Sequence, residues 1–191
     1  MSNDQAGEYY TAERWQNWLR RLRDANLDPE EEESVRLLWN LQDDTAIAVA
    51  KILADFEDGP LDEEAALTEL VDMHEIVFTE EAFDDEATAM LVEGAQRSLE
   101  CVLYAAQEFV AEGPAEGTVP EYIEAAAGAE ADDDLDAALG YCVQAGTLVI
   151  DDQTLDHDLT ENLEFGFVTE WVNGLDSLQR AMSEPEFVEE E

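Results

Sequence analysis

The sequence almost lacks lysine and has little positive charge of any kind. Lys51 is its only lysine, and eight Lys plus Arg stand against fifty Asp plus Glu, for a formal net charge of −42 over 191 residues. A compact protein with this excess of one sign repels itself in dilute buffer. At about 1 M salt the Debye length falls to about 3 Å, and surface carboxylates stop acting on one another. The composition therefore predicts a protein that folds in molar salt, as in an extreme halophile.

Intrinsic disorder is the competing explanation for so much acid, because chains of high net charge and low hydrophobicity cannot form a core. The hydrophobic share of this chain is 46%, which is ordinary for a globular domain. Trp, Phe, Leu, Ile and Val also recur at helical spacing along most of the sequence. We therefore expect a folded protein.

Cysteines and long apolar runs are also scarce. Cys101 and Cys142 both lie in apolar helical surroundings, which predicts two buried, reduced thiols rather than a disulfide. No apolar run approaches the roughly 18 residues that a membrane span needs. The first eight residues are polar and acidic, unlike a signal peptide. These features predict a cytoplasmic protein with no membrane contact.

Motifs that name a reaction are missing as well. The sequence has no Gly-x-Ser-x-Gly elbow, no His-Glu-x-x-His pattern and no glycine-rich phosphate loop followed by lysine. Neither cysteine has the basic or helix-start setting that lowers a thiol pKa. Carboxylate pairs occur everywhere, so a catalytic pair would look like solvated surface. The sequence favours a non-enzymatic protein and predicts no cofactor.

Helical periodicity predicts an all-α fold, an antiparallel helical bundle with at most one short strand-like segment. The predicted helices cover about 9–25, 28–58, 62–77, 84–111, 120–127, 135–146 and 158–183. Asp28 followed by Pro29 is a strong signal for the start of the second helix. The only β-branched run, Thr147 to Ile150, is predicted to be extended.

A linker at Gly113 to Gly117 divides the sequence. It predicts an N-terminal helical bundle over 1–112 and a C-terminal helical segment over 118–183, packed on that bundle. Residues 184–191 are an acidic tail, which we expect to be solvated.

Two stretches of the N-terminal half resemble a known family. They are Tyr9-Tyr10-Thr11-Ala12-Glu13-Arg14-Trp15, followed by Trp18-Leu19, and the run from Leu41 to Ile52. This pattern resembles an archaeal family, well represented in haloarchaea, that is catalogued as domain of unknown function 2150. The resemblance covers roughly the first two thirds of the chain and is weaker beyond Gly113. It implies a small acidic archaeal protein of the cytoplasm and carries no catalytic residue with it.

The predicted first helix holds the most unusual local composition. Half of all the cations fall within ten residues, interleaved with two tryptophans: Arg14, Trp15, Trp18, Arg20, Arg21 and Arg23. Arginine and tryptophan dominate binding hot spots, which makes these six residues candidates for binding a partner protein. The same residue types can pair with phosphate and stack on bases, but the net charge disfavours nucleic acid. The structural alternative is an amphipathic helix whose tryptophans are core and whose arginines pair with neighbouring acids.

The two histidines leave a metal-dependent enzyme open as a further alternative. His74 lies near Asp72 and Glu75 on a predicted helix, and His157 lies between Asp156 and Asp158 in a predicted loop. Imidazole with carboxylates can hold a transition metal, although no known ligand spacing is present here. Whether any specific metal binds is left open by the sequence.

Overall fold

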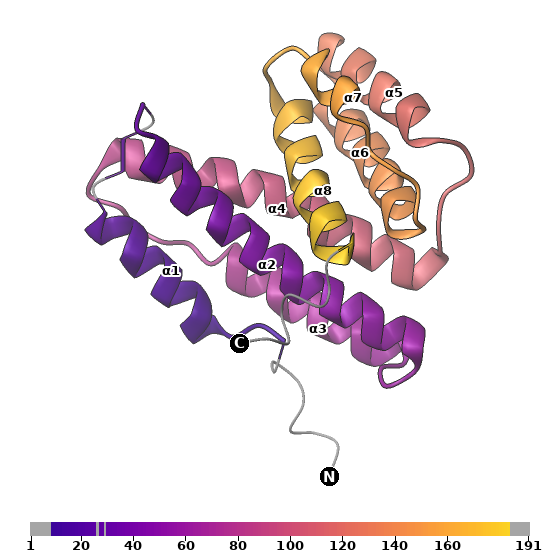
Figure 1. The fold of residues 1–191 in the computed structure, drawn as a ribbon, viewed down its shortest axis with the longest axis horizontal. Helices are drawn as coiled ribbons and strands as arrows, with labels where there is room; N and C mark the ends of the chain where they lie inside the picture. The colour runs from indigo at the N-terminus through magenta and orange to yellow at the C-terminus, as the bar shows by residue number, and fades with distance from the viewer. Residues whose placement is uncertain (1–8, 26, 29, 184–191) are drawn as a thin grey trace.

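The computed structural model describes residues 9–25, 27–28 and 30–183, and over these ranges it contains helices and no strand (Figure 1). The helices are α1 (Ala12–Asp24), α2 (Glu32–Asp58), α3 (Glu63–Val77), α4 (Glu86–Glu112), α5 (Val119–Ala131), α6 (Leu135–Ile150), α7 (His157–Glu161) and α8 (Phe167–Ser183). The predicted all-α fold is confirmed. The acidic tail at 184–191 lies outside the described residues.

Helix α4 joins two groups of helices. It contacts α2 and α3 from the N-terminal part of the chain, and α6 and α8 from the C-terminal part. In Figure 1, α5 to α8 lie together on one side of α4, and the C-terminal end of α8 lies against α2. Helices from the segment after the linker therefore contact α2 and α4, while the division of the chain into two parts at the linker stays a prediction.

Most helix boundaries follow the signals in the sequence. Asp62, Asp85 and Asp134 each accept a hydrogen bond from a backbone N–H in the first turn of the helix that follows. Thr118 and Glu121 form a reciprocal capping box at the start of α5. Gly59 ends α2 in the left-handed region, with φ of 103°. Local side-chain chemistry therefore fixes where these helices begin and end.

The start of α2 differs from its prediction. The helix begins at Glu32 with Glu31 as its N-cap, several residues after Asp28. The Asp28 carboxylate accepts from the Glu30 N–H at 2.9 Å, and its own N–H donates to the Ser34 hydroxyl at 3.0 Å. Asp28 therefore stabilises a turn ahead of α2, whereas Pro29 lies outside the described residues.

The segment Thr147 to Ile150 is helical, so its predicted extended structure is wrong. All four residues are buried in the last turn of α6. The Thr147 hydroxyl donates to the Gln144 carbonyl at 2.7 Å and accepts from the Ala115 N–H in the linker at 3.0 Å. Burial against α4 and α8 overrides the weak β preference of these residues, because the described chain offers no strand to pair with.

The predicted last helix is broken in two. The helix α7 ends at Glu161, with Asn162 as its C-cap, and α8 starts at Phe167. The Glu130 carboxylate, from α5, accepts from the Val168 N–H at 2.9 Å and so caps α8 from a distance. A Cβ at Gly166 would overlap this carboxylate. The break therefore depends on a residue far away in the sequence, which local patterns do not show.

Both cysteines are free and buried, as the sequence predicts. Burial raises the pKa of the Cys142 thiol to about 12, and it raises the pKa of Cys101 as well. Both thiols therefore stay protonated and act as small apolar core residues.

Candidate functional site

The helix α1 presents its apolar face to the protein interior. Trp15, Leu19 and Leu22 are almost completely buried, with Trp15 only 1% exposed. The Thr11 hydroxyl accepts from the Arg14 N–H and caps the helix at Ala12, three residues later than the predicted start at Tyr9. Trp15 is therefore a core residue, and a partner cannot contact it in this fold.

Two of the four arginines in α1 attach the helix to its neighbours. The Arg14 guanidinium donates to both carboxylate oxygens of Asp44 in α2, and Trp18 Nε1 donates to the same carboxylate at 2.8 Å. Arg23 pairs with Glu81 at 3.0 Å and lies 4.8 Å from the centre of the Phe83 ring. Arg14 and Arg23 thus have structural roles, as the amphipathic-helix alternative predicts.

The other two arginines remain on the surface. Arg20 donates to the Asn17 side chain at 3.0 Å, and the Arg21 guanidinium lies 4.3 Å from the centre of the half-buried Trp18 ring. Neither arginine pairs with a carboxylate of the residues that the structure describes. We call Trp18, Arg20 and Arg21 the α1 edge. The structure thus splits the six predicted residues into a buried or ion-paired set, Arg14, Trp15 and Arg23, and this partly exposed edge.

Neither histidine lies in a metal-binding cluster of the residues that the structure describes. His157 lies in the first turn of α7 rather than in a loop, and His74 stacks on Phe78 with ring centres 4.7 Å apart. Within residues 9–25, 27–28 and 30–183, no group of three His, Cys, Asp or Glu side chains is arranged to hold a metal ion. The metal-enzyme alternative therefore finds no ligand set in this part of the chain.

His74 nevertheless gives a prediction about pH. Its Nε2 is buried with no hydrogen-bond partner among the described residues, and burial lowers the pKa of this imidazole from its ordinary 6.5, against a smaller raising effect of Glu75. The unfolded chain therefore binds a proton at a higher pH than the folded chain does. The free energy of unfolding should fall as the pH drops below about 6.5.

Thermal unfolding of the wild type and of His74→Gln, in multimolar KCl between about pH 7.5 and pH 5.5, checks this effect. Most carboxylates stay ionised over this range, and their contributions cancel in the comparison of the two proteins. We expect the wild type to lose more stability than His74→Gln. Equal losses would show that His74 does not titrate differently in the folded state.

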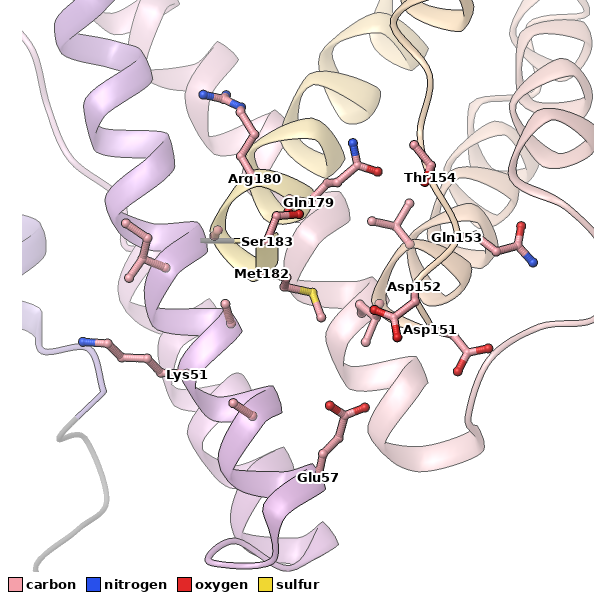
Figure 2. Close-up of a pocket in the computed structure, with 16 residues that line it drawn as sticks. Lys51, Glu57, Asp151, Asp152, Gln153, Thr154, Gln179, Arg180, Met182 and Ser183 are labelled. Atoms are coloured by element: carbon pink, nitrogen blue, oxygen red, sulfur yellow. The ribbon is translucent and has the colours of Figure 1, made fainter. Parts of the chain in front are cut away.

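A cleft of about 610 Å³ lies between the C-terminal half of α2, the end of α6 with the turn that follows it, and the end of α8 (Figure 2). Its apolar lining residues are Ile47, Ala50, Ala54, Val149, Ile150, Ala181 and Met182. The cleft has the size of a typical small-molecule site.

One wall of the cleft is acidic. Figure 2 shows Glu57 on α2 and Asp151 and Asp152 after α6 bordering the same space. Burial raises the pKa of Glu57, and the negative charges of Asp152, Asp58 and Asp151 raise it further. Asp152 holds a left-handed backbone conformation, with φ of 70°. Asp151 and Asp152 thus place negative charge near the Glu57 carboxylate.

Sequence reasoning did not find this cleft. Its lining comes from three segments that are far apart in the sequence, and the acids among them look like any other acidic surface. The only local signal was the pair Asp151-Asp152 directly after an apolar run. The α1 edge, by contrast, was visible in the local composition.

Together, the fold and these sites define a small, strongly acidic all-helical protein, and no helix in its described part is long and apolar enough to cross a membrane. The sequence matches, over residues 8–191, the family described as uncharacterised proteins conserved in archaea (DUF2150), and the chain belongs to this family. The match extends well beyond the first two thirds of the chain. No curated protein and no solved structure matches the chain.

Proposed function

We propose that this protein is a non-enzymatic interaction or regulatory protein in the high-salt cytoplasm of a halophilic archaeon, and that the α1 edge contacts a partner protein. One observation carries this proposal: the Arg21 guanidinium lies 4.3 Å from the centre of the half-buried Trp18 ring, and neither Arg21 nor Arg20 has a carboxylate partner among the described residues. Arg14, Arg23, Arg97 and Arg180 all have one.

The chemistry of the edge indicates the kind of partner. The Trp18 ring is a half-buried apolar surface, and the Arg21 guanidinium lies against it. A partner that offers carboxylates beside an apolar patch could pair with the guanidinium groups and cover the ring. Arginine keeps its directional hydrogen bonds in a desolvated interface even where salt screens long-range attraction.

Nucleic acid fits this edge less well than a protein does. Binding to phosphates weakens steeply as salt rises, and a net charge of −42 opposes the approach of another polyanion. Half of the eight cations of the chain, Arg14, Arg23, Arg97 and Arg180, already pair with carboxylates and are not free to neutralise phosphates. An acidic surface of a partner protein can be bound by the two arginines of the edge alone.

Affinity capture of the tagged protein from its own cells, lysed and washed in multimolar KCl, tests the proposal. We expect a near-stoichiometric protein partner that Arg20→Gln/Arg21→Gln reduces by about tenfold or more, since each hot-spot arginine contributes about 2 kcal/mol. Arg36→Gln/Lys51→Gln is the matched control, because it removes two exposed cations of α2 that also lack a carboxylate partner in the described chain.

The control should retain the partner. Equal loss in both double variants would show that overall charge, and not the α1 edge, determines the binding. Nucleic acid in the eluate, with a partner that disappears after nuclease treatment, would favour the nucleic-acid alternative. A solitary protein would contradict the interaction proposal.

A further inference from the structure

The last turn of α8 forms part of the cleft between α2, α6 and α8. Ala181, Met182 and Ser183 all line this cleft, and Ser183 is the last residue that the structure describes before the acidic tail at 184–191. Figure 2 shows the Met182 side chain in the space between α2 and the turn after α6. The acidic tail therefore begins at the cleft.

The apolar lining of the cleft is partly open to solvent. Val149 and Ile150 are buried at 4% and 2% exposure. Ile47, Ala50 and Met182 are only partly buried, although Ala50 and Met182 pack against the core. An apolar side chain that covered this lining would remove further apolar surface from water.

The polar side chains around the cleft offer little to a polar ligand. Gln179 bonds to both the N–H and the carbonyl of Leu155, and Gln153 bonds to backbone groups at 117 and 119. Arg180 pairs with Asp43. The carboxylates of the acidic wall are exposed and can stay hydrated. The cleft is therefore better suited to an apolar side chain than to a polar group.

The acidic tail contains two large apolar residues among its acids. Phe187 and Val188 lie next to each other, and the other residues of the tail are five glutamates and Pro185. Phe187 is four residues beyond Ser183, a distance that an extended chain covers with about 13 Å. The Phe187 ring can therefore reach back over the cleft from the end of α8.

We propose that the acidic tail binds in the cleft of its own chain, with the Phe187 ring on the apolar lining and the glutamates in solvent. Pro185 favours this path, because it lacks an N–H and disfavours a helical conformation at Glu184, so that α8 does not carry the tail straight past the cleft. The short tether keeps Phe187 at an effective concentration of about millimolar or more. This contact does not depend on the function proposed for the α1 edge.

Molar salt is a condition for this contact. Docking brings the five glutamates of the tail towards Glu57, Asp151 and Asp152. At about 1 M salt the Debye length of about 3 Å suppresses their repulsion, while the burial of the ring remains favourable. The docked population should therefore fall as KCl is lowered within the range where the helices stay folded. The expectation that the tail is solvated then applies to its glutamates and not to Phe187.

The rate at which a cysteine in the cleft reacts with iodoacetamide, measured by mass spectrometry of the full chain in multimolar KCl, tests the proposal. Ala50→Cys places a thiol on the cleft lining, whereas Cys101 and Cys142 are buried. We expect Phe187→Ser to raise the rate at position 50 about tenfold, since burial of one phenylalanine shifts an equilibrium by roughly 10- to 100-fold. Glu190→Ser is the matched control in the same tail and should leave the rate unchanged.

A second cysteine reports on reactivity outside the cleft. Gly140 is exposed on α6, and a Cβ there meets nothing within 4 Å, so Gly140→Cys should react equally fast with and without Phe187→Ser. No change at Ala50→Cys on Phe187→Ser, an equal rise with Glu190→Ser, or a rise at both cysteines would overturn the proposal. Protection that disappears when the protein is diluted about a hundredfold would overturn it in favour of the tail of a second copy.

Discussion

Gly174→Ala should lower the free energy of unfolding by about 3 kcal/mol, through a clash between two helices. Gly174 faces the backbone of α4, and a Cβ at this position would overlap the Ser98 carbonyl oxygen and press on Val102. A backbone carbonyl inside a helix cannot move aside as a flexible side chain can. The helices α4 and α8 would have to separate, and the core between them would lose its packing.

Thermal unfolding in multimolar KCl, followed by circular dichroism, measures this loss. For a chain of this length we expect the midpoint to fall by about 6–12 °C. Gly140→Ala is the control, because a Cβ at Gly140 in α6 meets nothing within 4 Å. That substitution should stabilise the protein by up to about 1 kcal/mol, since alanine favours helix over glycine. An equal midpoint in the two variants would contradict the close α4–α8 contact.

Lowering KCl from multimolar to about 0.1 M should unfold or expand the protein. At about 0.1 M the Debye length is about 10 Å, so carboxylates on neighbouring helices repel one another again. Five ion pairs of arginine with Asp or Glu link the described residues, and none has both partners buried, so they offset little of a net charge of −42. We expect the helical circular dichroism signal to be lost cooperatively along the salt titration.

A control with sucrose distinguishes the screening of charge from the general stabilising effect of cosolutes. It strengthens the burial of apolar surface but does not screen charge. Sucrose in low salt should therefore restore much less helix than KCl of the same osmolality. A circular dichroism signal that stays flat down to about 0.1 M KCl would contradict the halophilic interpretation of the composition.

The features that the sequence predicted correctly are those set by short-range chemistry. The starts of the helices after Asp62 and Asp85 depend on residues within one helical turn, and so does the stop at Gly59. The apolar stripe of α1 likewise fixes which face is buried, because side chains three and four residues apart share a face. These local interactions form in any tertiary structure that buries the apolar stripe of the helix.

The errors arose where a distant residue decides the local structure. Thr147 to Ile150 are β-branched or large and look extended on their own, yet contacts with α4 and α8 keep them helical. The break before α8 depends on Glu130, which lies in α5. A Cβ at Gly94 would meet only the Glu170 side chain, at 3.7 Å, whereas a Cβ at Gly174 would overlap the Ser98 backbone. Pattern alone does not tell which glycine faces another backbone.

The candidate site was predictable only in part for the same reason. Composition located the arginines and tryptophans of α1, but the partners of Arg14 and Arg23 lie in α2 and in the segment before α4. Only the three-dimensional arrangement shows that Arg20 and Arg21 are left without a carboxylate from the described chain. The acidic wall of the cleft could not be recognised either, because its residues come from separate segments and resemble the other acids among the fifty.

Photo-cross-linking in living cells tests the central claim, that the α1 edge contacts a partner protein, most directly. A benzophenone-bearing residue in place of Asp24, an exposed position about one turn from Arg20 and Arg21, would lie beside the edge. The same residue in place of Glu124, exposed on α5, serves as the control. We predict one discrete protein adduct from position 24, lost with Arg20→Gln/Arg21→Gln, and none from position 124. No adduct from position 24, or the same adducts from both positions, would contradict the account.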